Sequence, residues 1–175
     1  MGRRPLDAGL GRADTRSMRR TARLLTLALG GLIATPAAAH ADITAFLGAT
    51  LTPSSRTARG VAVGINLLVV GFEFEYASTA EDPIEDGPSL KTGMLNGLVQ
   101  TPTRTQLYLT AGGGFFRERL NGEGETSFGT NVGGGIKLGL AGPLRLRVDY
   151  RIFNLRGNPR HRNPQRFYVG ANFSF

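Results

Sequence analysis

The chain has 175 residues, enough for one domain of ordinary size, and it contains no cysteine, which excludes disulfides and thiolate metal sites. Its formal net charge is +8, but seven of the 21 basic residues precede residue 24. From Asp42 onward there are 14 basic and 11 acidic residues, so the main part of the chain gives little support to nucleic-acid binding.

The first residues have the pattern of a secretory signal peptide. Three arginines precede an apolar run over residues 24–33, and small residues ending in Ala39-His40-Ala41 follow it. This run is too short for a transmembrane helix, which needs about 20 apolar residues. We predict a signal peptide over residues 1–41, cleaved before Asp42. Met18 is an alternative start, because the leader from there has ordinary proportions.

Beyond the leader, apolar and polar residues alternate with a period of two, which is typical of β-strands and not of helices. The clearest run, residues 144–152, has five apolar residues alternating with Arg145, Arg147, Asp149 and Arg151. A strand of about nine residues has the length that a tilted transmembrane strand requires. In chain order, we predict eight strands over residues 43–51, 61–67, 72–76, 90–100, 107–115, 128–140, 144–152 and 167–175.

The predicted connections alternate between long and short. The long ones are residues 52–59, 78–89, 118–126 and 156–166, and the short ones are 68–70, 101–103 and 141–143. This alternation is typical of outer-membrane barrels, which have long outer loops and short periplasmic turns. A sheet in a bilayer must also close on itself, because an open edge would leave backbone groups unpaired in hydrocarbon. We therefore predict an all-β, eight-stranded, antiparallel, up-and-down transmembrane barrel over residues 42–175.

At this point the sequence resembles the small outer-membrane β-barrels related to the transmembrane domain of outer-membrane protein A. The resemblance covers residues 42–175 and rests on the leader, the eight amphipathic strands and the alternating aromatic end of the chain. It implies export through the periplasm to the bacterial outer membrane. It also implies that Phe167, Phe173 and Phe175 form an end signal for the barrel-assembly machinery. We expect a monomer that contacts outer-membrane lipid.

Charged residues on the polar faces of the strands predict an ion-pair network in the barrel lumen. Eight strands enclose a space that side chains just fill. Glycines at positions 112, 114, 133 and 135 leave room for long side chains. Acid–base catalysis by Glu73 and Glu75 is an alternative interpretation, but ion pairing with the lumenal arginines explains these two carboxylates without catalysis. The predicted network consists of Glu73, Glu75, Lys137, Arg145, Arg147, Asp149 and Arg151.

The last predicted loop carries the other candidate residues. Its arginines could contact lipopolysaccharide phosphates, because a guanidinium pairs well with phosphate oxygens. His161 is the only histidine after the leader. Some barrels of this kind are lipid A–modifying enzymes, and the deacylase type needs a His/Ser pair, yet no serine adjoins His161. We expect no cofactor and no metal. The candidate lipopolysaccharide contacts are Arg156, Arg160, Arg162 and Arg166.

These features predict a non-enzymatic, integral outer-membrane barrel with a structural or surface-interaction role. A narrow pore or carrier for small solutes is the first alternative, and a lipid A–modifying enzyme is the second. The filled lumen argues against a wide channel. A soluble, lipocalin-like barrel is the main alternative fold, and it would turn its apolar face inward. The direction in which Arg145, Arg147 and Arg151 point distinguishes the two folds.

Overall fold

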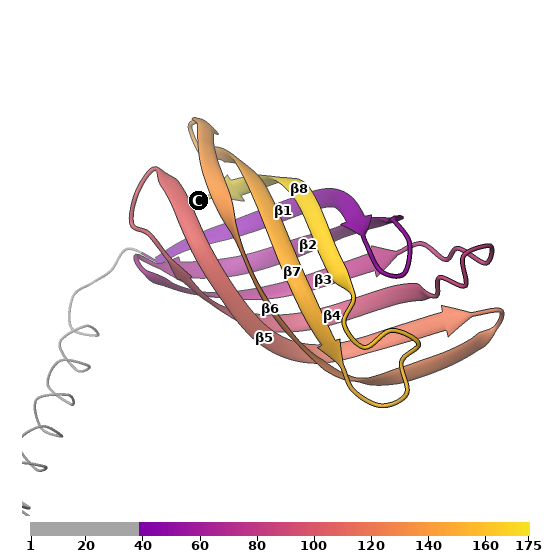
Figure 1. Cartoon of the computed structure of the whole chain (residues 1–175). Helices are drawn as coiled ribbons and strands as arrows, with labels where there is room; N and C mark the ends of the chain where they lie inside the picture. Colours follow the sequence, from indigo (N-terminus) through magenta and orange to yellow (C-terminus); the bar gives the residue numbers. More distant parts are fainter. Residues whose placement is uncertain (1–38) are drawn as a thin grey trace, which may run out of the picture. The chain divides into compact units, whose positions relative to one another are not determined.

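The computed structural model describes residues 39–175, which form a closed antiparallel barrel (Figure 1). Neighbours in the chain are neighbours in the sheet, and β8 pairs with β1 to close it. This confirms the predicted fold. The predicted signal peptide lies outside the described residues except for residues 39–41, and its cleavage site stays a prediction. The strands are β1 Ala39–Thr50, β2 Arg56–Leu67, β3 Val70–Thr79, β4 Ser89–Gln100, β5 Thr105–Leu120, β6 Glu123–Ala141, β7 Leu144–Leu155 and β8 Gln165–Ser174.

Side chains alternate between the outside of the barrel and its lumen along every strand. On β7, Arg147 and Arg151 are fully buried in the lumen, whereas Tyr150 and Ile152 are exposed on the outer wall. The polar face is therefore inside, and the lipocalin-like alternative is wrong. The same alternation settles β4, whose sequence left its facing open. Its inward residues include Met94, and its outward residues include Leu95.

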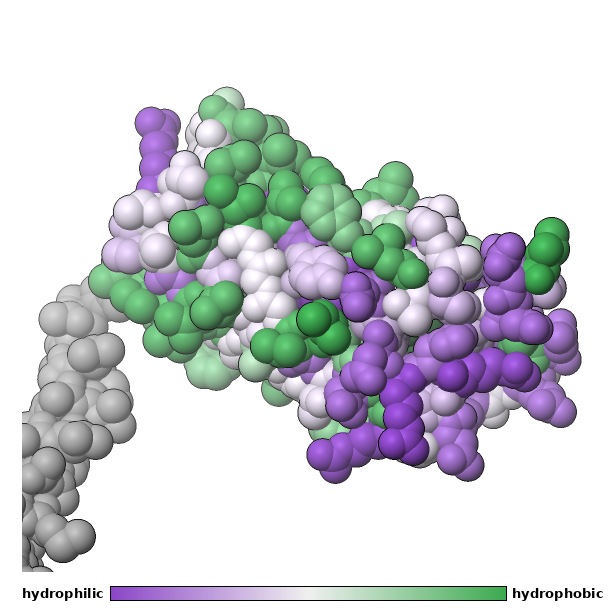
Figure 2. Space-filling model, viewed as in Figure 1, coloured by the Kyte–Doolittle hydropathy of each residue, from purple (hydrophilic) through white to green (hydrophobic). Residues whose placement is uncertain are grey.

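The outer wall carries a continuous apolar band. Cross-strand neighbours such as Val63, Phe74 and Leu95 stand side by side on it and are all exposed. Figure 2 shows apolar residues over one part of the barrel and hydrophilic residues gathered at the opposite end. An exposed apolar surface of this extent on a closed barrel is the surface that lipid chains cover. Among the described residues, no helix is long and apolar enough to cross a bilayer.

The two ends of the barrel differ in their connections. The end with residues 68–69, 101–104 and 142–143 carries short turns and also holds both ends of the barrel sheet; we call it the turn end. The opposite end carries the connections between β1 and β2, β3 and β4, β5 and β6, and β7 and β8; we call it the loop end. In outer-membrane barrels the short turns face the periplasm, so we expect the loop end to face outward.

One predicted loop is wrong. We expected a connection over residues 118–126, but β5 and β6 continue as a paired ribbon up to a two-residue turn at Asn121-Gly122. Both turn residues have positive φ angles, 51° and 89°, which fits the Asn-Gly turns that favour tight hairpins. The sequence does not indicate strands in this ribbon, because neither of its faces is apolar enough to give a clear alternation.

The apolar band gives a direct test of the membrane-facing wall. Leu95 lies on the outer wall with 64% of its surface exposed. Leu95→Arg should reduce the free energy of unfolding by about 2–4 kcal/mol, because it places a charge in lipid. Ser89→Arg, outward on the same strand but at the loop end, should cost about 0–1 kcal/mol. Urea unfolding in lipid vesicles measures both. Equal costs would contradict the band.

Candidate functional site in the barrel lumen

Two arginines of β7 form the centre of the lumen. Arg147 pairs with Glu73 of β3, reaches Asp149 at 2.9 Å, and donates a hydrogen bond to the Tyr108 hydroxyl at 2.7 Å. Arg151 pairs with Glu73 at 2.8 Å and with Asp149 at 2.9 Å. Each carboxylate therefore lies between two guanidinium groups. Tyr108 completes the arrangement by donating its own hydroxyl hydrogen to Asp149.

Glu75 connects this centre to β8. Its carboxylate lies 3.1 Å from the Arg166 guanidinium, accepts a hydrogen bond from the Tyr168 hydroxyl at 3.1 Å, and forms an ion pair with Arg151 at 3.2 Å. All four of these side chains are buried. Glu75 is thus surrounded by donors from β7 and β8 across the lumen.

A separate ion pair lies nearer the turn end. Lys137 of β6 reaches Asp42 of β1 at 2.6 Å, and Asn66 of β2 donates to the same carboxylate at 2.8 Å. Lys137 and Asp42 are 1% and 2% exposed. A lysine this deeply buried needs an anionic partner to remain charged, and Asp42 supplies it.

The charges of this lumenal network balance. We define the network by its ion pairs, which join four cations to four anions. Ionised groups with so little exposure are stable only when they are paired and hydrogen-bonded. The balance means that no single charge can be removed without leaving its partner uncompensated. The members are Lys137, Arg147, Arg151, Arg166, Asp42, Glu73, Glu75 and Asp149.

Small residues make space for these long side chains. A methyl group added at Gly133 would lie 2.8 Å from Cγ of Arg151. One added at Gly135 would lie 2.5 Å from the Tyr108 hydroxyl. Both separations are shorter than van der Waals contact, so Gly133 leaves room for Arg151 and Gly135 leaves room for Tyr108. On β5, a methyl group added at Gly112 would instead lie 2.2 Å from the side-chain oxygen of Asn96.

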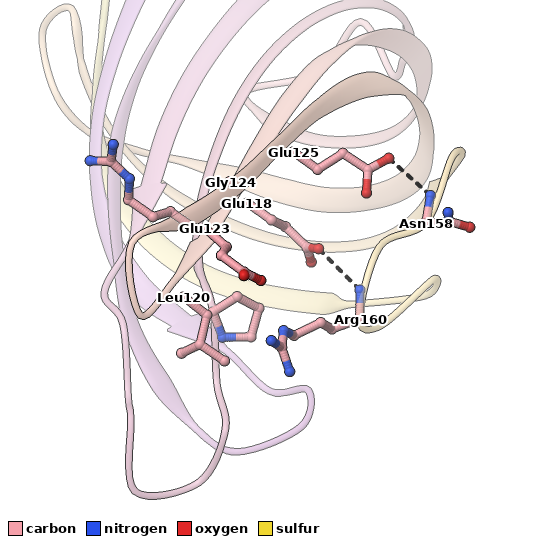
Figure 3. Close-up of a pocket in the computed structure, with 9 residues that line it drawn as sticks. Glu118, Leu120, Glu123, Gly124, Glu125, Asn158 and Arg160 are labelled. Atoms are coloured by element: carbon pink, nitrogen blue, oxygen red, sulfur yellow. Dashed lines mark hydrogen bonds between the residues drawn. The ribbon is translucent and has the colours of Figure 1, made fainter.

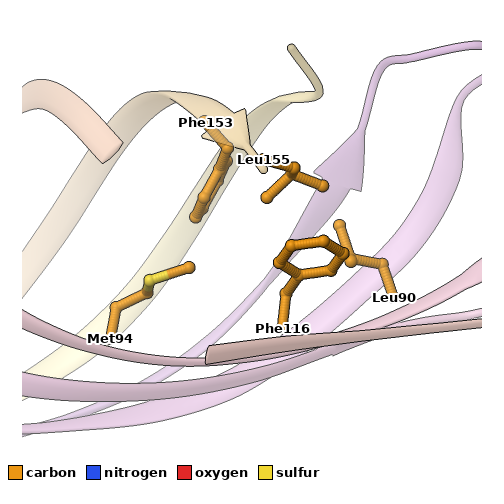
Figure 4. Close-up of a cluster of buried hydrophobic side chains, with 5 residues drawn as sticks. All are labelled: Leu90, Met94, Phe116, Phe153 and Leu155. Atoms are coloured by element: carbon orange, nitrogen blue, oxygen red, sulfur yellow. The ribbon is translucent and has the colours of Figure 1, made fainter. Parts of the chain in front are cut away.

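An apolar cluster lies next to the network on the side of the loop end (Figure 4). Along β7 the inward residues change from Leu155 and Phe153 in this cluster to Arg151 and Arg147 in the network. The Arg166 guanidinium lies 4.6 Å from the centre of the Phe153 ring and joins the two layers. This cluster was not predicted from the sequence, and its members are Leu90, Met94, Phe116, Phe153 and Leu155.

A cavity lies at each end of the lumen. The turn-end cavity has a volume of about 230 Å³, and Gln106 and Arg145 are among its lining residues. The loop-end cavity has a volume of about 380 Å³ and lies between the β5–β6 ribbon and the β7–β8 loop (Figure 3). There, Glu118 accepts a hydrogen bond from the backbone N–H of Arg160 at 3.1 Å, and Glu125 accepts one from that of Asn158 at 2.9 Å.

Two predicted site residues lie elsewhere than expected. Arg145 does not join the ion pairs and instead donates to Gln106 at 2.6 Å. Arg166, which we had grouped with the surface arginines of the last loop, is fully buried and pairs with Glu75. Its proposed lipopolysaccharide contact is therefore wrong, because β8 begins at Gln165 and turns this side chain inward. Asp42 was missed, although its phase on β1 could have revealed it.

The remaining predicted residues are on the surface. Arg156, Arg160 and Arg162 are exposed in the β7–β8 loop, which also holds His161. Phe167 and Phe173 point outward from β8. Phe175 follows that strand, and its backbone N–H and carbonyl both bond to Ala41 at 2.9 Å. In the part of the chain that the structure describes, no group of three or more metal-ligating side chains is positioned to hold a metal ion.

No protein-family model and no curated protein matches the sequence, but solved structures share its fold. The N-terminal β-barrel domain of Pseudomonas aeruginosa OprF is 16% identical, with a TM-score of 0.61 over 78% of this chain and 97% of that one. A major outer-membrane protein of Thermus thermophilus is 14% identical, with a TM-score of 0.61 over 79% and 100%. The outer-membrane enzyme PagL is 12% identical, with a TM-score of 0.50 over 75% and 98%.

These likenesses concern the fold, which is that of the small outer-membrane barrels. A closed barrel of this fold with an apolar wall belongs in a bilayer, and the bacterial outer membrane is the membrane that holds such barrels. The predicted localisation is confirmed. Because an enzyme shares the fold with other outer-membrane proteins, the fold by itself does not decide whether this chain is a catalyst.

The charge balance of the lumenal network is testable through Glu75 and Arg166. Glu75→Gln leaves Arg166 without its carboxylate partner and should reduce the free energy of unfolding by about 3–5 kcal/mol. Adding Arg166→Met removes the uncompensated charge and should restore much of this loss. Urea unfolding in vesicles measures the single and double variants. A double variant that is no more stable than Glu75→Gln would contradict the pairing.

A pH effect is expected at the loop-end cavity. Arg117 and Arg119 point outward on either side of Glu118, which places this segment beyond the apolar band. Burial raises the pKa of Glu118, opposed by the hydrogen bond from the Arg160 backbone. Protonation of Glu118 therefore stabilises the arrangement in which this side chain lies buried between the β5–β6 ribbon and the β7–β8 loop. This contribution is present below the ordinary pKa of 4.5 and is lost as pH rises through the raised value.

Amide hydrogen exchange in the β7–β8 loop measures this effect. After correction for intrinsic rates, protection of the loop should decrease as pH rises through the raised pKa of Glu118. Glu118→Gln should remove that dependence, because glutamine does not titrate. Glu123→Gln, at a residue that also lines the cavity, should keep it. Identical pH profiles for the two variants would contradict the assignment to Glu118.

Proposed function

We propose that this protein is a monomeric, non-enzymatic outer-membrane barrel with a closed lumen, acting as a structural element that presents its loop end to the outside. The observation that carries the proposal is the order of layers along the lumen. Along β5, the inward residues pass from Glu118 at the loop-end cavity to Phe116 in the apolar cluster, then to Tyr108, which is hydrogen-bonded to the lumenal network, and to Gln106 at the turn-end cavity.

These layers support a barrier rather than a passage. The apolar cluster offers no hydrogen bonds to a permeating solute, and the network beside it already uses its charges on one another. A solute would have to break several buried ion pairs without replacing them. An eight-stranded barrel also leaves little space for a path around these side chains. The closed lumen favours a structural role over the alternative of a narrow pore or carrier.

The loop end supports a role in surface interaction. The β5–β6 ribbon and the β7–β8 loop are held together by Glu118 and Glu125, which fixes the shape of this end. Rigid, polar surfaces suit protein or lipid contacts because little conformational entropy is lost on binding.

The end of the chain supports recognition by the barrel-assembly machinery as part of the proposal. Phe173 and Phe175 present aromatic rings outward, with centroids 6.2 Å apart, next to the seam where β8 meets β1. Until that seam closes, both rings and the strand edge are accessible to a partner. The aromatic end and the unpaired edge together would give the machinery a surface to bind before insertion.

Planar-bilayer recording tests the closed lumen. The purified barrel should show only small or rare openings. Glu73→Ser combined with Arg147→Ser removes one cation and one anion, opens space in the network, and should raise the conductance. Arg145→Ser combined with Gln106→Ser, at the turn-end cavity, should not. Steady large openings of the unchanged protein would contradict the proposal and favour a pore. In a separate incubation of the protein with lipid A, chemical alteration of the lipid would contradict the non-enzymatic role.

A further inference from the structure

Four cations stand on the outside of the barrel wall, away from the lumenal network. Arg59 of β2, Lys91 of β4, and Arg117 and Arg119 of β5 are exposed and point outward. Alternation in the sequence does not set these cations apart, because three lie at the ends of predicted strands or in predicted loops. None of them forms an ion pair with a carboxylate of residues 39–175.

The strand register aligns these cations in one row. Arg59 pairs with Ser78, Ser78 with Lys91, and Lys91 with Arg117. Arg119 follows Arg117 on the same face of β5, one step nearer the loop end, and pairs with Ser89. Neighbouring strands are about 4.8 Å apart, so the row from β2 to β5 spans roughly 14 Å. Positive charge is thus concentrated on one sector of the wall.

The row lies directly beside the apolar band. The next outward position on each strand, toward the turn end, is Val61, Tyr76, Gly93 or Phe115, and these four are again cross-strand neighbours. The ring of Phe115 packs edge-on against Phe128, with centroids 6.0 Å apart. Aromatic residues at the edge of an apolar band mark the membrane interface. The cations therefore lie at the level of the lipid headgroups in the outer leaflet.

Two hollows accompany the row. One, of about 480 Å³, includes Arg59, Ser78 and Lys91 in its lining. The other, of about 140 Å³, is lined by Ser89, Lys91, Arg117 and Arg119. Each places two or more cations beside a serine, and in the smaller hollow the Ser89 hydroxyl donates to the Arg119 carbonyl at 3.1 Å. Guanidinium and ammonium groups placed this close together suit the oxygens of a phosphate group.

We propose that this row, which we call the wall cations, binds the phosphate groups of an outer-leaflet glycolipid, lipopolysaccharide. Two adjacent hollows sharing Lys91 favour a headgroup with two phosphates over one with a single phosphate. The proposal rests on the placement of the barrel in the outer membrane and not on the closed lumen. It also differs from the contact by the loop arginines that the sequence suggested, because the strand register aligns the wall cations in one row on the outer wall.

Native mass spectrometry in uncharged detergent tests the site with bisphosphorylated lipid A as the probe. The unchanged protein should retain lipid A, bind the monophosphorylated form more weakly, and bind phosphatidylglycerol or inorganic phosphate weakest. Lys91→Gln combined with Arg117→Gln and Arg119→Gln should raise the dissociation constant for lipid A about 100-fold, from about 1 kcal/mol for each cation. Heat-modifiable migration on gels verifies that each variant is folded.

A loop variant of equal charge change serves as the matched control. Arg156→Gln combined with Arg160→Gln and Arg162→Gln also removes three positive charges, and it should change the dissociation constant less than threefold. Equal losses in both triple variants would mean general electrostatic attraction and would overturn the site. A loss confined to the loop variant, no loss in either, or equal binding of all the anionic probes would overturn it as well. A conducting barrel that still binds lipid A would contradict only the closed lumen.

Discussion

Eight charged side chains fit inside a narrow barrel because four cations face four anions within hydrogen-bonding distance. An eight-stranded barrel holds little water, so neither sign of charge could be solvated there alone. This constraint determines the neighbours of the network. Tyr108 and Tyr168 supply hydroxyl groups to the carboxylates, and Gly133 leaves space for Arg151. The residues that line the interior are therefore those that hydrogen-bond to the ion pairs or leave space for them.

The network also limits where the protein can interact with other molecules. Its charges are used internally, and the apolar cluster containing Phe116 and Phe153 lies on the side of the loop end. Groups that can still bind something are found at the loop end and on the outer wall, where Lys91 and Arg117 have no carboxylate partner among residues 39–175. In the proposed function, interior residues close the lumen and exterior residues provide contacts.

The parts that sequence could predict are those in which alternation fixes the facing of a side chain. Arg147 and Arg151 lie in an uninterrupted period-two run, so their inward position followed from β7 alone. Arg166 lies at the start of β8, where a difference of two residues in the strand boundary separates lumen from loop. The β5–β6 ribbon was missed because it extends beyond the apolar band and has polar residues on both faces. Partners that meet across the lumen, such as Glu75 of β3 and Arg166 of β8, depend on the register of several strands, which no local pattern contains.

Register is also what couples the lumenal network to the wall cations. Side chains alternate with a period of two, so a slip of one residue in a strand exchanges its two faces. In β3 that slip would turn Glu73 and Glu75 toward lipid and leave the four lumenal cations with only two of their four anions. In β4 it would bring Lys91 inside, where the four cations already balance four anions. Each misregistered arrangement is penalised on both faces at once. The buried ion pairs and the outward cations therefore specify the same register, and this makes a barrel with so polar an interior a single structure.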